Sequence, residues 1–380
     1  MPPCGMTGSM EKHGSSAIPP SDTTFVSITM VRAVAIVAII VENCFTLLPW
    51  KNGESAADLL ATLVTSVTGT FVHLFFILSG FGLALSCLGK SPVSWTAWAR
   101  KRFAKVIIPF WTAVIVTFAL ANLAYSWAPD SGQQPFSWVT LLAYLTFLRN
   151  AYSPGWELNS TLWFMPVIIG LYALFPLLLQ VLKRYGLAVL MALALIVGNS
   201  SVAVCTYLGY PVSHQGALPL YFVDEFALGM ALAAVALRDP GQLNRLEGPG
   251  AFFAGMVFYT AGGFMARYEW LGAGSGTYND IFTASGLYLI LLPLCRRVSQ
   301  AASPRLLKLF DSVSRNAYLM YLVHAPIILY ILKPYAGAYF RTSVGALPMI
   351  FLTGLYAFLV FTLVEGVQLA RKNVMAVMHL

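Results

Sequence analysis

The stretch Phe25-Val-Ser-Ile-Thr-Met-Val-Arg32-Ala-Val-Ala-Ile-Val-Ala-Ile-Ile-Val-Glu42-Asn43 opens the first apolar segment of the chain and indicates its fold class. The segment is long enough for a helix that crosses a bilayer, which takes about 20 residues. Arg32 and Asn43 lie eleven residues apart. In an α-helix this spacing is about three turns and 16 Å, so both side chains lie on one face. Because charged side chains at membrane depth are costly and are kept where they meet a partner, a cavity or a substrate, this polar face is the first candidate site.

The composition is that of an integral membrane protein. The chain has 380 residues, of which 58% are hydrophobic and 10% charged, and its mean hydropathy is +0.73; soluble domains carry about 25% charged residues. Windows of about 20 apolar residues predict an all-α, polytopic protein with about ten transmembrane helices. They lie near 27–49, 64–88, 104–127, 160–182, 187–209, 219–237, 250–267, 280–297, 316–334 and 346–368. The apolar stretch 137–148 is too short to span easily and is typical of an interfacial or re-entrant helix.

The net charge of +8 reflects topology and not nucleic-acid binding. Nearly all basic residues outside the spans follow the even-numbered predicted spans, so the positive-inside rule places both termini in the cytoplasm. We therefore expect a multi-pass protein of the cell membrane, with membrane lipids as partners and no nucleic acid. The residues in question are Lys90, Arg100, Lys101, Arg102, Lys105, Lys183, Arg184, Arg238, Arg245, Arg296, Arg297, Arg305, Lys308, Arg315, Arg371 and Lys372.

The predicted domain organisation is one membrane domain with two short tails. Residues 1–22 are rich in Ser, Pro, Gly and Met, which predicts a disordered cytoplasmic tail. The transmembrane domain is predicted over 23–372, and 373–380 form a second short cytoplasmic tail. The five cysteines are scattered without disulfide or metal-ligand spacing, so we predict no metal site and no bound cofactor.

The second predicted span contains His73 and, further on, Ser79, Gly80 and Gly82. Small residues at these positions allow close helix approach, which is explained by packing alone. His73 lies near the middle of the predicted span. A buried histidine is more often a hydrogen-bonded structural group than a catalyst, so the structural role is favoured there.

A basic run follows this span and contains Arg100, Arg102 and Lys105. It has two interpretations that are compatible with each other. One is an ordinary cytoplasmic anchor that obeys the positive-inside rule. The other is a clamp for the phosphates of an acyl-CoA, because guanidinium groups match phosphate oxygens.

Two further spans carry polar or aromatic groups near their predicted outer ends. Trp163 lies where an interfacial aromatic belt is expected. Asp224 and Glu225 are adjacent acids inside an apolar run. One of them either binds a hydroxyl acceptor from the outer side or pairs with Arg267, Arg341 or another polar group.

The ninth predicted span carries Tyr321 and His324, which are neighbours on one helix face because they are three residues apart. Pro326 removes a backbone donor just beyond and so frees a carbonyl near the histidine. An imidazole at this depth acts as a general base, a proton relay or a structural donor. The residues alone do not choose among these roles.

Taken in order, these segments resemble acyltransferase family 3, the ten-helix membrane acyltransferases that modify surface polysaccharides, glycans and some lipids. Joint order and spacing carry the resemblance, which covers nearly the whole predicted membrane region. The matching words are Val31-Arg32-Ala-Val-Ala-Ile, Leu74-Phe75-Phe76-Ile-Leu-Ser79-Gly80-Phe81, the basic run ending at Pro109, Leu162-Trp163-Phe164-Met165 with Tyr172 and Pro176, Phe226-Ala-Leu-Gly229-Met230, and Tyr318-Leu-Met-Tyr321-Leu-Val-His324-Ala-Pro326.

The resemblance implies acyl transfer across the membrane. A donor, usually acetyl-CoA, is taken from the cytoplasm near the basic residues, and its acyl group reaches a hydroxyl, less often an amine, of a glycan or lipid-linked acceptor. In the family pattern a basic residue in the first span is followed eleven positions later by a histidine, the expected catalytic base. Arg32 matches the first position, whereas Asn43 occupies the second.

This departure leaves three explanations, because a neutral carboxamide cannot accept a proton as imidazole does. Another base, among Glu42, His73 and His324, serves instead. Alternatively, transfer depends mainly on positioning and charge stabilisation. In the third explanation the chain has lost transfer chemistry and keeps the scaffold to bind or move a lipid-linked glycan.

The leading hypothesis is a membrane acyltransferase that acts on a surface or lipid-linked saccharide. Arg32 orients the donor, and Arg100, Arg102 and Lys105 bind its phosphates. His324 with Tyr321 forms the stand-in acid-base pair, and Asn43 holds the position of the missing base. The residues expected to line the cavity on the acceptor side are His73, Ser79, Trp163, Asp224 and Glu225. The competing hypothesis is a non-catalytic exporter or assembly subunit on the same scaffold. An ion-coupled transporter is a third reading, but no repeat or pair of broken helices is visible.

Overall fold

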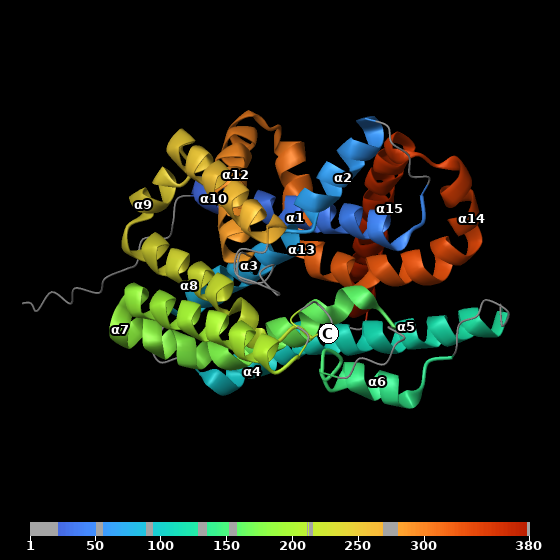
Figure 1. The fold of residues 1–380 in the computed structure, drawn as a ribbon, viewed down its shortest axis with the longest axis horizontal. Coiled ribbons are helices and arrows are strands. Elements are labelled where there is room, and N and C mark those ends of the chain that lie inside the picture. The colour runs from blue at the N-terminus through green and yellow to red at the C-terminus, as the bar shows by residue number, and fades with distance from the viewer. Residues whose placement is uncertain are drawn as a thin grey trace, which may run out of the picture.

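The computed structural model describes residues 22–50, 56–88, 94–127, 135–151, 158–210, 212, 216–268 and 280–377, and every regular element in these ranges is helical. The all-α prediction is therefore confirmed for this part of the chain (Figure 1). The helices of the first half are α1 (Asp22–Leu47), α2 (Ala56–Thr68), α3 (Phe71–Leu88), α4 (Trp95–Arg102), α5 (Ile108–Trp127), α6 (Trp138–Leu145) and α7 (Phe164–Tyr207). Those of the second half are α8 (Val223–Arg238), α9 (Pro240–Arg245), α10 (Pro249–Arg267), α12 (Asp280–Ala301), α13 (Pro304–Ile327), α14 (Lys333–Ser343) and α15 (Ala346–Val377).

Eight helical stretches of the described residues are long and apolar enough to cross a membrane. A polytopic membrane protein is thus supported by length and composition. The stretches are Val26–Leu47, Asp58–Leu88, Trp95–Ser126, Ser160–Tyr207, Pro219–Arg238, Asp280–Ala301, Pro304–Gly337 and Ala346–Arg371. The 19-residue helix α10, where a span was predicted at 250–267, is not among them.

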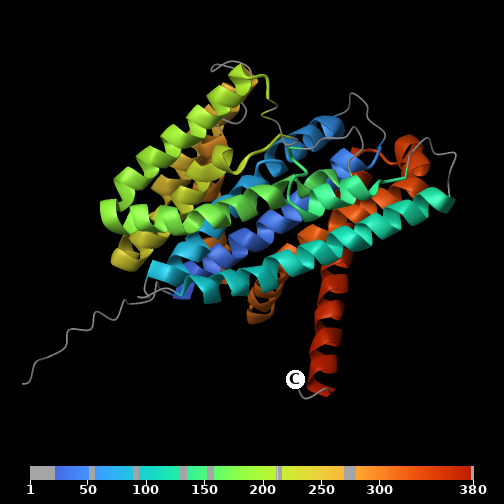
Figure 2. The same ribbon diagram turned by 90° about the horizontal axis from the view of Figure 1, so that it is seen from below.

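Helix α7 consists of two arms that meet at Gly186. This glycine has φ 85° and ψ −178°, a conformation that side chains other than hydrogen strongly disfavour. The chain bends sharply there, and the two arms diverge (Figure 2). The bend falls between the predicted spans 160–182 and 187–209, because a glycine follows the basic pair Lys183 and Arg184 at the end of the first arm.

The predicted span 64–88 is divided by a turn between α2 and α3. Thr68 ends α2, Gly69 and Thr70 form the turn, and α3 begins at Phe71. Glycine and threonine are poor helix formers, and backbone bonds from Gly69 to Thr65 and from His73 to Thr70 close the two ends. His73 therefore lies in the first turn of α3. The whole stretch Asp58–Leu88 is one candidate span, and His73 lies near its middle, as predicted.

The basic segment is continuous with the next helix through a π-helical turn. Residues Phe103–Ile107 form this turn between α4 and α5. It leaves the Val106 carbonyl accessible to the Tyr318 hydroxyl of α13, which donates to it at 2.6 Å. The stretch predicted as short and interfacial, 137–148, contains only the eight-residue α6, whose first turn is capped by Ser137 accepting from the Thr140 amide.

Helix α1 is the central element of the bundle. It contacts α2, α3, α12, α13 and α15, so apolar residues on several of its sides are fully buried, among them Val31, Ala35, Ile36 and Ile40. In Figure 1 the α8–α10–α12 group and the α5–α6 group lie at opposite ends of the molecule, with α1, α3 and α13 between them.

The two predicted tails differ in what the structure describes. Residues 1–21 lie outside the described residues, and α1 begins at Asp22. At the other end α15 continues as a helix to Val377, beyond the predicted boundary at 372, and its C-terminal half projects from the bundle (Figure 2).

Candidate functional site: a cationic cavity and a buried acidic cluster

A cavity of about 450 Å³ lies between α1, α3, α7, α13 and the basic segment. Four cations line it: Arg32, Arg102, Lys105 and Arg315. Lys105 and Arg315 are exposed, whereas Arg32 and Arg102 are partly buried. None of the described residues that line this space is acidic. We call it the cationic cavity, and its charge suits an anionic ligand.

The local structure explains why the cations converge. Arg102 ends α4 and Lys105 lies in the π-helical turn, which the Tyr318 hydroxyl holds against α13. The Arg102 guanidinium lies 5.9 Å from the centre of the Tyr172 ring. Predicted donor-binding residues Arg102 and Lys105 thus share the cavity with Arg32, whereas Arg100 lines an adjoining groove beside Trp98.

The cavity is deep along α3. Val72, Phe75, Ser79 and Gly82 line it from this helix, and Leu83 is the last residue of α3 that lines it. Val72 to Leu83 is eleven residues, about 16 Å of helix rise. Ser79, which was predicted as a packing residue or as cavity lining, and Gly82, which was predicted only as a packing residue, both line the cavity. A Cβ added to Gly82 would meet nothing within 4 Å.

Tyr321 and His324 lie together as predicted, but only Tyr321 reaches the cavity. Their ring centres are 5.8 Å apart, and the Tyr321 hydroxyl donates to the Thr161 carbonyl. His324 is 0% exposed. Its Nδ1 lies 2.7 Å from the Tyr321 carbonyl oxygen of its own helix, and its Nε2 has no partner among the described residues. The Tyr356 hydroxyl donates to the His324 carbonyl at 2.5 Å.

Asn43 is turned toward its own helix. Its Nδ2 donates to the Ile39 carbonyl at 2.9 Å, and the residue is buried. Ile39 lines the cationic cavity, but Asn43 does not. The polar face noticed in the sequence is therefore divided, with Arg32 in the cavity and Asn43 occupied by an i−4 bond.

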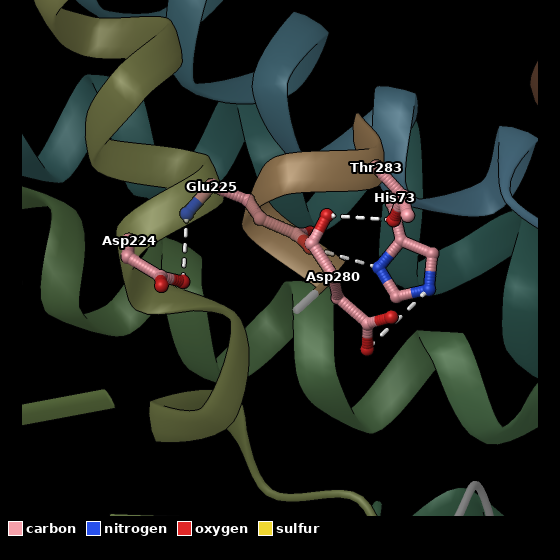
Figure 3. A network of polar contacts seen from close by, with 5 residues as sticks. All are labelled: His73, Asp224, Glu225, Asp280 and Thr283. Atoms are coloured by element: carbon pink, nitrogen blue, oxygen red, sulfur yellow. Dashed lines mark hydrogen bonds and ion pairs between the residues drawn. The ribbon is translucent and has the colours of Figure 1, made fainter. Parts of the chain in front are cut away.

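A second polar group, which we call the acidic cluster, consists of His73, Asp224, Glu225 and Asp280 (Figure 3). The His73 Nδ1 lies 2.9 Å from Glu225 Oε1, and its Nε2 lies 3.8 Å from Asp280 Oδ2. Asp224 accepts a hydrogen bond from the Glu225 amide at 2.9 Å. His73, Asp224 and Glu225 are buried, whereas the Asp280 side chain is 25% exposed.

The cluster answers the sequence question about the partner of the two acids. Glu225 pairs with His73, which corresponds to the predicted alternative of another polar group. Arg341 is exposed on α14, and the Arg267 side chain lies outside the described residues. Within the described part of the chain no group of three or more His, Cys, Asp and Glu has an arrangement that could hold a metal ion.

Three helix N-termini build this cluster. His73 is in the first turn of α3, Asp224 and Glu225 are in the first turn of α8, and Asp280 is the first residue of α12. The unpaired amides and the dipole at a helix N-terminus stabilise negative charge. The three helix N-termini therefore help to stabilise three carboxylates that have only one imidazole as a side-chain partner.

Two glycines bring α3 and α8 close enough for the His73–Glu225 bond. A Cβ added to Gly80 would lie 2.0 Å from the Phe226 carbonyl oxygen, and one added to Gly229 would lie 1.9 Å from that of Ile77. Only glycine allows backbones to approach this closely. The Phe226-Ala-Leu-Gly229 word thus has a packing function that the sequence could not assign to a particular neighbour.

An aromatic layer separates the cluster from the cavity. It consists of Phe76, Trp163, Phe164 and Phe222. Ring centres are 4.8 Å apart for Phe76 and Phe164 and also for Phe76 and Phe222, and Trp163 packs 5.7 Å from Phe222. Trp163 is 8% exposed, so its side chain is held in this buried layer.

Two members of these sites were not singled out from the sequence. Asp280 is the first residue of the predicted span 280–297 and was not considered. The available signal was that Asp224 also lies near the start of a predicted span, so both carboxylates could lie at the same depth. Arg315 was counted only as a positive-inside charge. Tyr172, known there only as part of a matching word, lines the cavity between Arg32 and Arg102.

Comparison with known proteins gives one match. A family model described as an acyltransferase domain matches residues 25–365. The chain has no match among the curated proteins or the solved structures. The matched range begins in α1 and ends in α15, so it includes the cationic cavity, the acidic cluster and the aromatic layer.

Proposed function

The chain belongs to acyltransferase family 3, and on that premise we propose that it moves an acyl group, in the simplest case acetyl, from cytoplasmic acyl-CoA to a hydroxyl of a surface or lipid-linked saccharide. The observation that carries the proposal is the cationic cavity: four cations and no acid line it among the described residues. Acyl-CoA is the donor class that combines several phosphates with a long, narrow thioester arm. Such a molecule matches a cavity that is cationic at one end and apolar further in.

Residue types along the cavity suit the parts of this donor. The exposed cations Lys105 and Arg315, with Arg102, would bind the phosphates, because charge-assisted bonds to phosphate are among the stronger polar contacts. Arg32 lies deeper on α1 and would orient the thioester carbonyl. Beyond it, Phe75, Phe164 and Tyr321 offer an apolar end for the acyl group.

The proposed topology has ten membrane crossings with both termini in the cytoplasm of a cell-membrane protein. The count takes the two arms of α7 as separate crossings and includes α10. It agrees with the basic residues, which fall on one side. In this arrangement α3, α8 and α12 all begin at the outer side, so the acidic cluster lies there and the cationic cavity opens to the cytoplasm.

The alternative function is a non-catalytic scaffold that binds or exports a polysaccharide or lipid-linked sugar. A specific observation favours it: Asn43 replaces the expected base and its amide is bonded to its own helix. In addition, no histidine, aspartate or glutamate lines the cationic cavity in the described part of the chain. On this reading the cavity would hold an anionic cargo and no bond would be broken.

Transfer of label from radiolabelled acetyl-CoA tests the two functions. The purified protein in vesicles receives the donor on one side and a saccharide or glycolipid extract of the native membranes as the acceptor. We expect label in a hydroxylamine-sensitive ester of the extract and equimolar free CoA. Binding of CoA without label transfer, under conditions where a relative with the span-1 histidine is active, would favour the non-catalytic scaffold.

The Asn43→His substitution separates the explanations further. If the native chain lacks a base, the new imidazole is expected to create acetyl-CoA hydrolysis where none existed. If the native chain already transfers acetyl groups, Asn43→His should change the rate little, and the base must be sought elsewhere in the structure.

A further inference from the structure

We propose that His73 is the general base of the transfer on the acceptor side, with Glu225 as its positioning residue and Asp280 as a contact for the acceptor. This inference rests on the proposed acyl transfer and adds the residue that replaces the missing span-1 histidine. It also names the chemical character of the acceptor. The acidic cluster in Figure 3 carries it.

The geometry of His73 is that of a carboxylate-oriented imidazole. Glu225 Oε1 lies 2.9 Å from Nδ1. In the neutral form of the ring that this contact favours, Nδ1–H donates to the carboxylate and Nε2 carries the lone pair, which is the form that acts as a base. Nε2 points toward Asp280, the most exposed member of the cluster, at 3.8 Å. A hydroxyl that approaches this pair from the side can donate its proton to Nε2 while it lies next to the Asp280 carboxylate. The Glu225 carboxylate at Nδ1 would stabilise the imidazolium that forms when Nε2 takes up the proton.

An unpartnered buried atom points to a ligand at the same place. Glu225 Oε2 has no hydrogen-bond partner among the described residues, although Glu225 is 1% exposed. A buried charged oxygen left without a donor is costly. The hydroxyl groups of a bound polyol would supply that donor, which a purely structural His73–Glu225 pair does not.

The cationic cavity reaches the turn of α3 that carries His73. Val72 and Phe75, on either side of His73 in the chain, both line the cavity. Between the imidazole and the cavity lie Phe76 and Phe222, whose rings are stacked 4.8 Å apart, with Phe222 5.6 Å from the His73 ring. Only this part of the aromatic layer has to open for the thioester carbon to meet a hydroxyl held at His73.

The chemical step balances without any further reactant. The acceptor hydroxyl gives its proton to His73 Nε2 while its oxygen forms a bond to the thioester carbonyl carbon. The tetrahedral intermediate collapses with breakage of the carbon–sulfur bond. The CoA thiolate leaves toward the cationic cavity and takes up a proton, and His73 loses its proton before the next turnover.

The charge of the cluster defines the acceptor. One imidazole faces the carboxyls of Asp224, Glu225 and Asp280, and none of the described lysines or arginines is seen to pair with them. An anionic group beside the reacting hydroxyl would be repelled. We therefore infer that the acceptor is uncharged or cationic around the hydroxyl that is acylated.

His324 provides the comparison that makes the proposal testable. It is equally buried, but its Nδ1 is bonded to backbone carbonyls of its own helix and it faces no carboxylate in the described structure. The experiment measures acetyl transfer from labelled acetyl-CoA to the membrane extract, together with CoA binding and thermal unfolding. The variants are His73→Gln, His73→Ala, Glu225→Gln and His324→Gln. Glu247→Gln is the matched control for loss of a buried carboxylate, because Glu247 pairs with Arg296.

We expect His73→Gln to lower kcat at least 100-fold, since a general base contributes roughly 10²–10⁴-fold, while CoA affinity changes less than twofold. The acid limb of the pH profile, set by His73 facing Asp224, Glu225 and Asp280, should disappear. Glu225→Gln should lower kcat about 10-fold and displace that limb. Glu247→Gln should leave the limb in place, and imidazole should partly rescue His73→Ala.

The contrary outcomes are distinct. If the wild type is active and His73→Gln keeps kcat within threefold, or if His324→Gln alone abolishes transfer, the proposal is overturned. If the His73 variants lose CoA binding and imidazole restores nothing, the cluster is structural and the proposal is again overturned. A wild type that binds acetyl-CoA but transfers nothing refutes the proposed function itself.

Discussion

The cationic cavity and the acidic cluster lie on two sides of one aromatic layer and are built in opposite ways. Long Arg and Lys side chains reach into the cavity, and two of them, Lys105 and Arg315, remain exposed. The cluster instead uses short side chains in the first turns of three helices, and two glycines set its geometry. The difference teaches where substitutions are tolerated. Single charges at the cavity can be replaced without loss of the fold. The cluster, in contrast, forms only while α3 and α8 are in contact.

The largest effect is expected from Gly229→Ala, which tests whether the cluster depends on that contact. The new Cβ would lie 1.9 Å from the Ile77 carbonyl oxygen, so the helices must separate. We expect a loss of about 3 kcal/mol of stability, in the upper range for overpacking. Thermal unfolding in detergent measures it, and acetyl transfer should fall with it.

Gly263→Ala is the matched control for that substitution. Gly263 is on α10, and a Cβ there meets nothing within 4 Å. Alanine should therefore be neutral or stabilise by up to about 1 kcal/mol through helix propensity. Equal stability of the two variants would show that the close contact of α3 and α8 at Gly80 and Gly229 does not hold the cluster together.

The next largest effect concerns the deepest cation of the cavity. Arg32→Gln removes a charge that lies in the cavity with no acidic residue among its described neighbours there. A charge-assisted contact is worth about 2 kcal/mol, which corresponds to roughly 30-fold weaker CoA binding. Calorimetry with CoA measures the change. Unaltered affinity would mean that the donor does not reach this depth.

A smaller, salt-dependent effect is expected at the entrance. Arg102→Gln and Lys105→Gln should each weaken CoA binding by about 0.5–1 kcal/mol at low salt, and less at high salt, because charges that are exposed or only partly buried are screened. Arg184→Gln serves as the control, since Arg184 lies over Tyr185 and outside the cavity. If all three variants bind CoA with the same affinity, Arg102 and Lys105 do not bind the donor, and their role is to orient the chain in the membrane.

The smallest effect is expected at Asn43. Its amide is bonded to the Ile39 carbonyl and does not line the cavity, so Asn43→Ala should change stability and transfer by no more than about 0.5 kcal/mol. Rate measurements with the same donor and extract test this. A loss of 100-fold would instead place Asn43 at the reaction centre.

Much of the architecture is encoded locally and could be predicted. Hydropathy windows and the placement of Lys and Arg depend on the bilayer and not on neighbouring helices, and the structure has helices at each predicted span. The bend at Gly186 fell where a glycine followed a basic pair. The turn before Phe71 was missed because Gly69 and Thr70 interrupt the helix without lowering the hydropathy of the window.

The site was only partly predictable for a different reason. Arg32, Arg102, Lys105 and Tyr321 were selected because charge or family word marked them, and the structure brings all four to one cavity. The partner of Glu225 was not predictable, because His73 is 152 residues away and the two meet only through a helix crossing. Asn43 looked equivalent to Arg32 on the helix face, yet its short side chain turned to its own backbone.

The sequence by itself determined that this is a helical membrane protein of acyltransferase family 3, with a cation in the first span and no histidine eleven residues later. These properties follow from the composition, from the hydropathy of the apolar segments and from the order of the short sequence motifs. Tertiary structure alone decided that the cations share one cavity, that the acids meet an imidazole, and that aromatic rings divide the two. The physical reason is that helix crossing angles and glycine contacts, which join residues far apart in the chain, choose which polar faces meet.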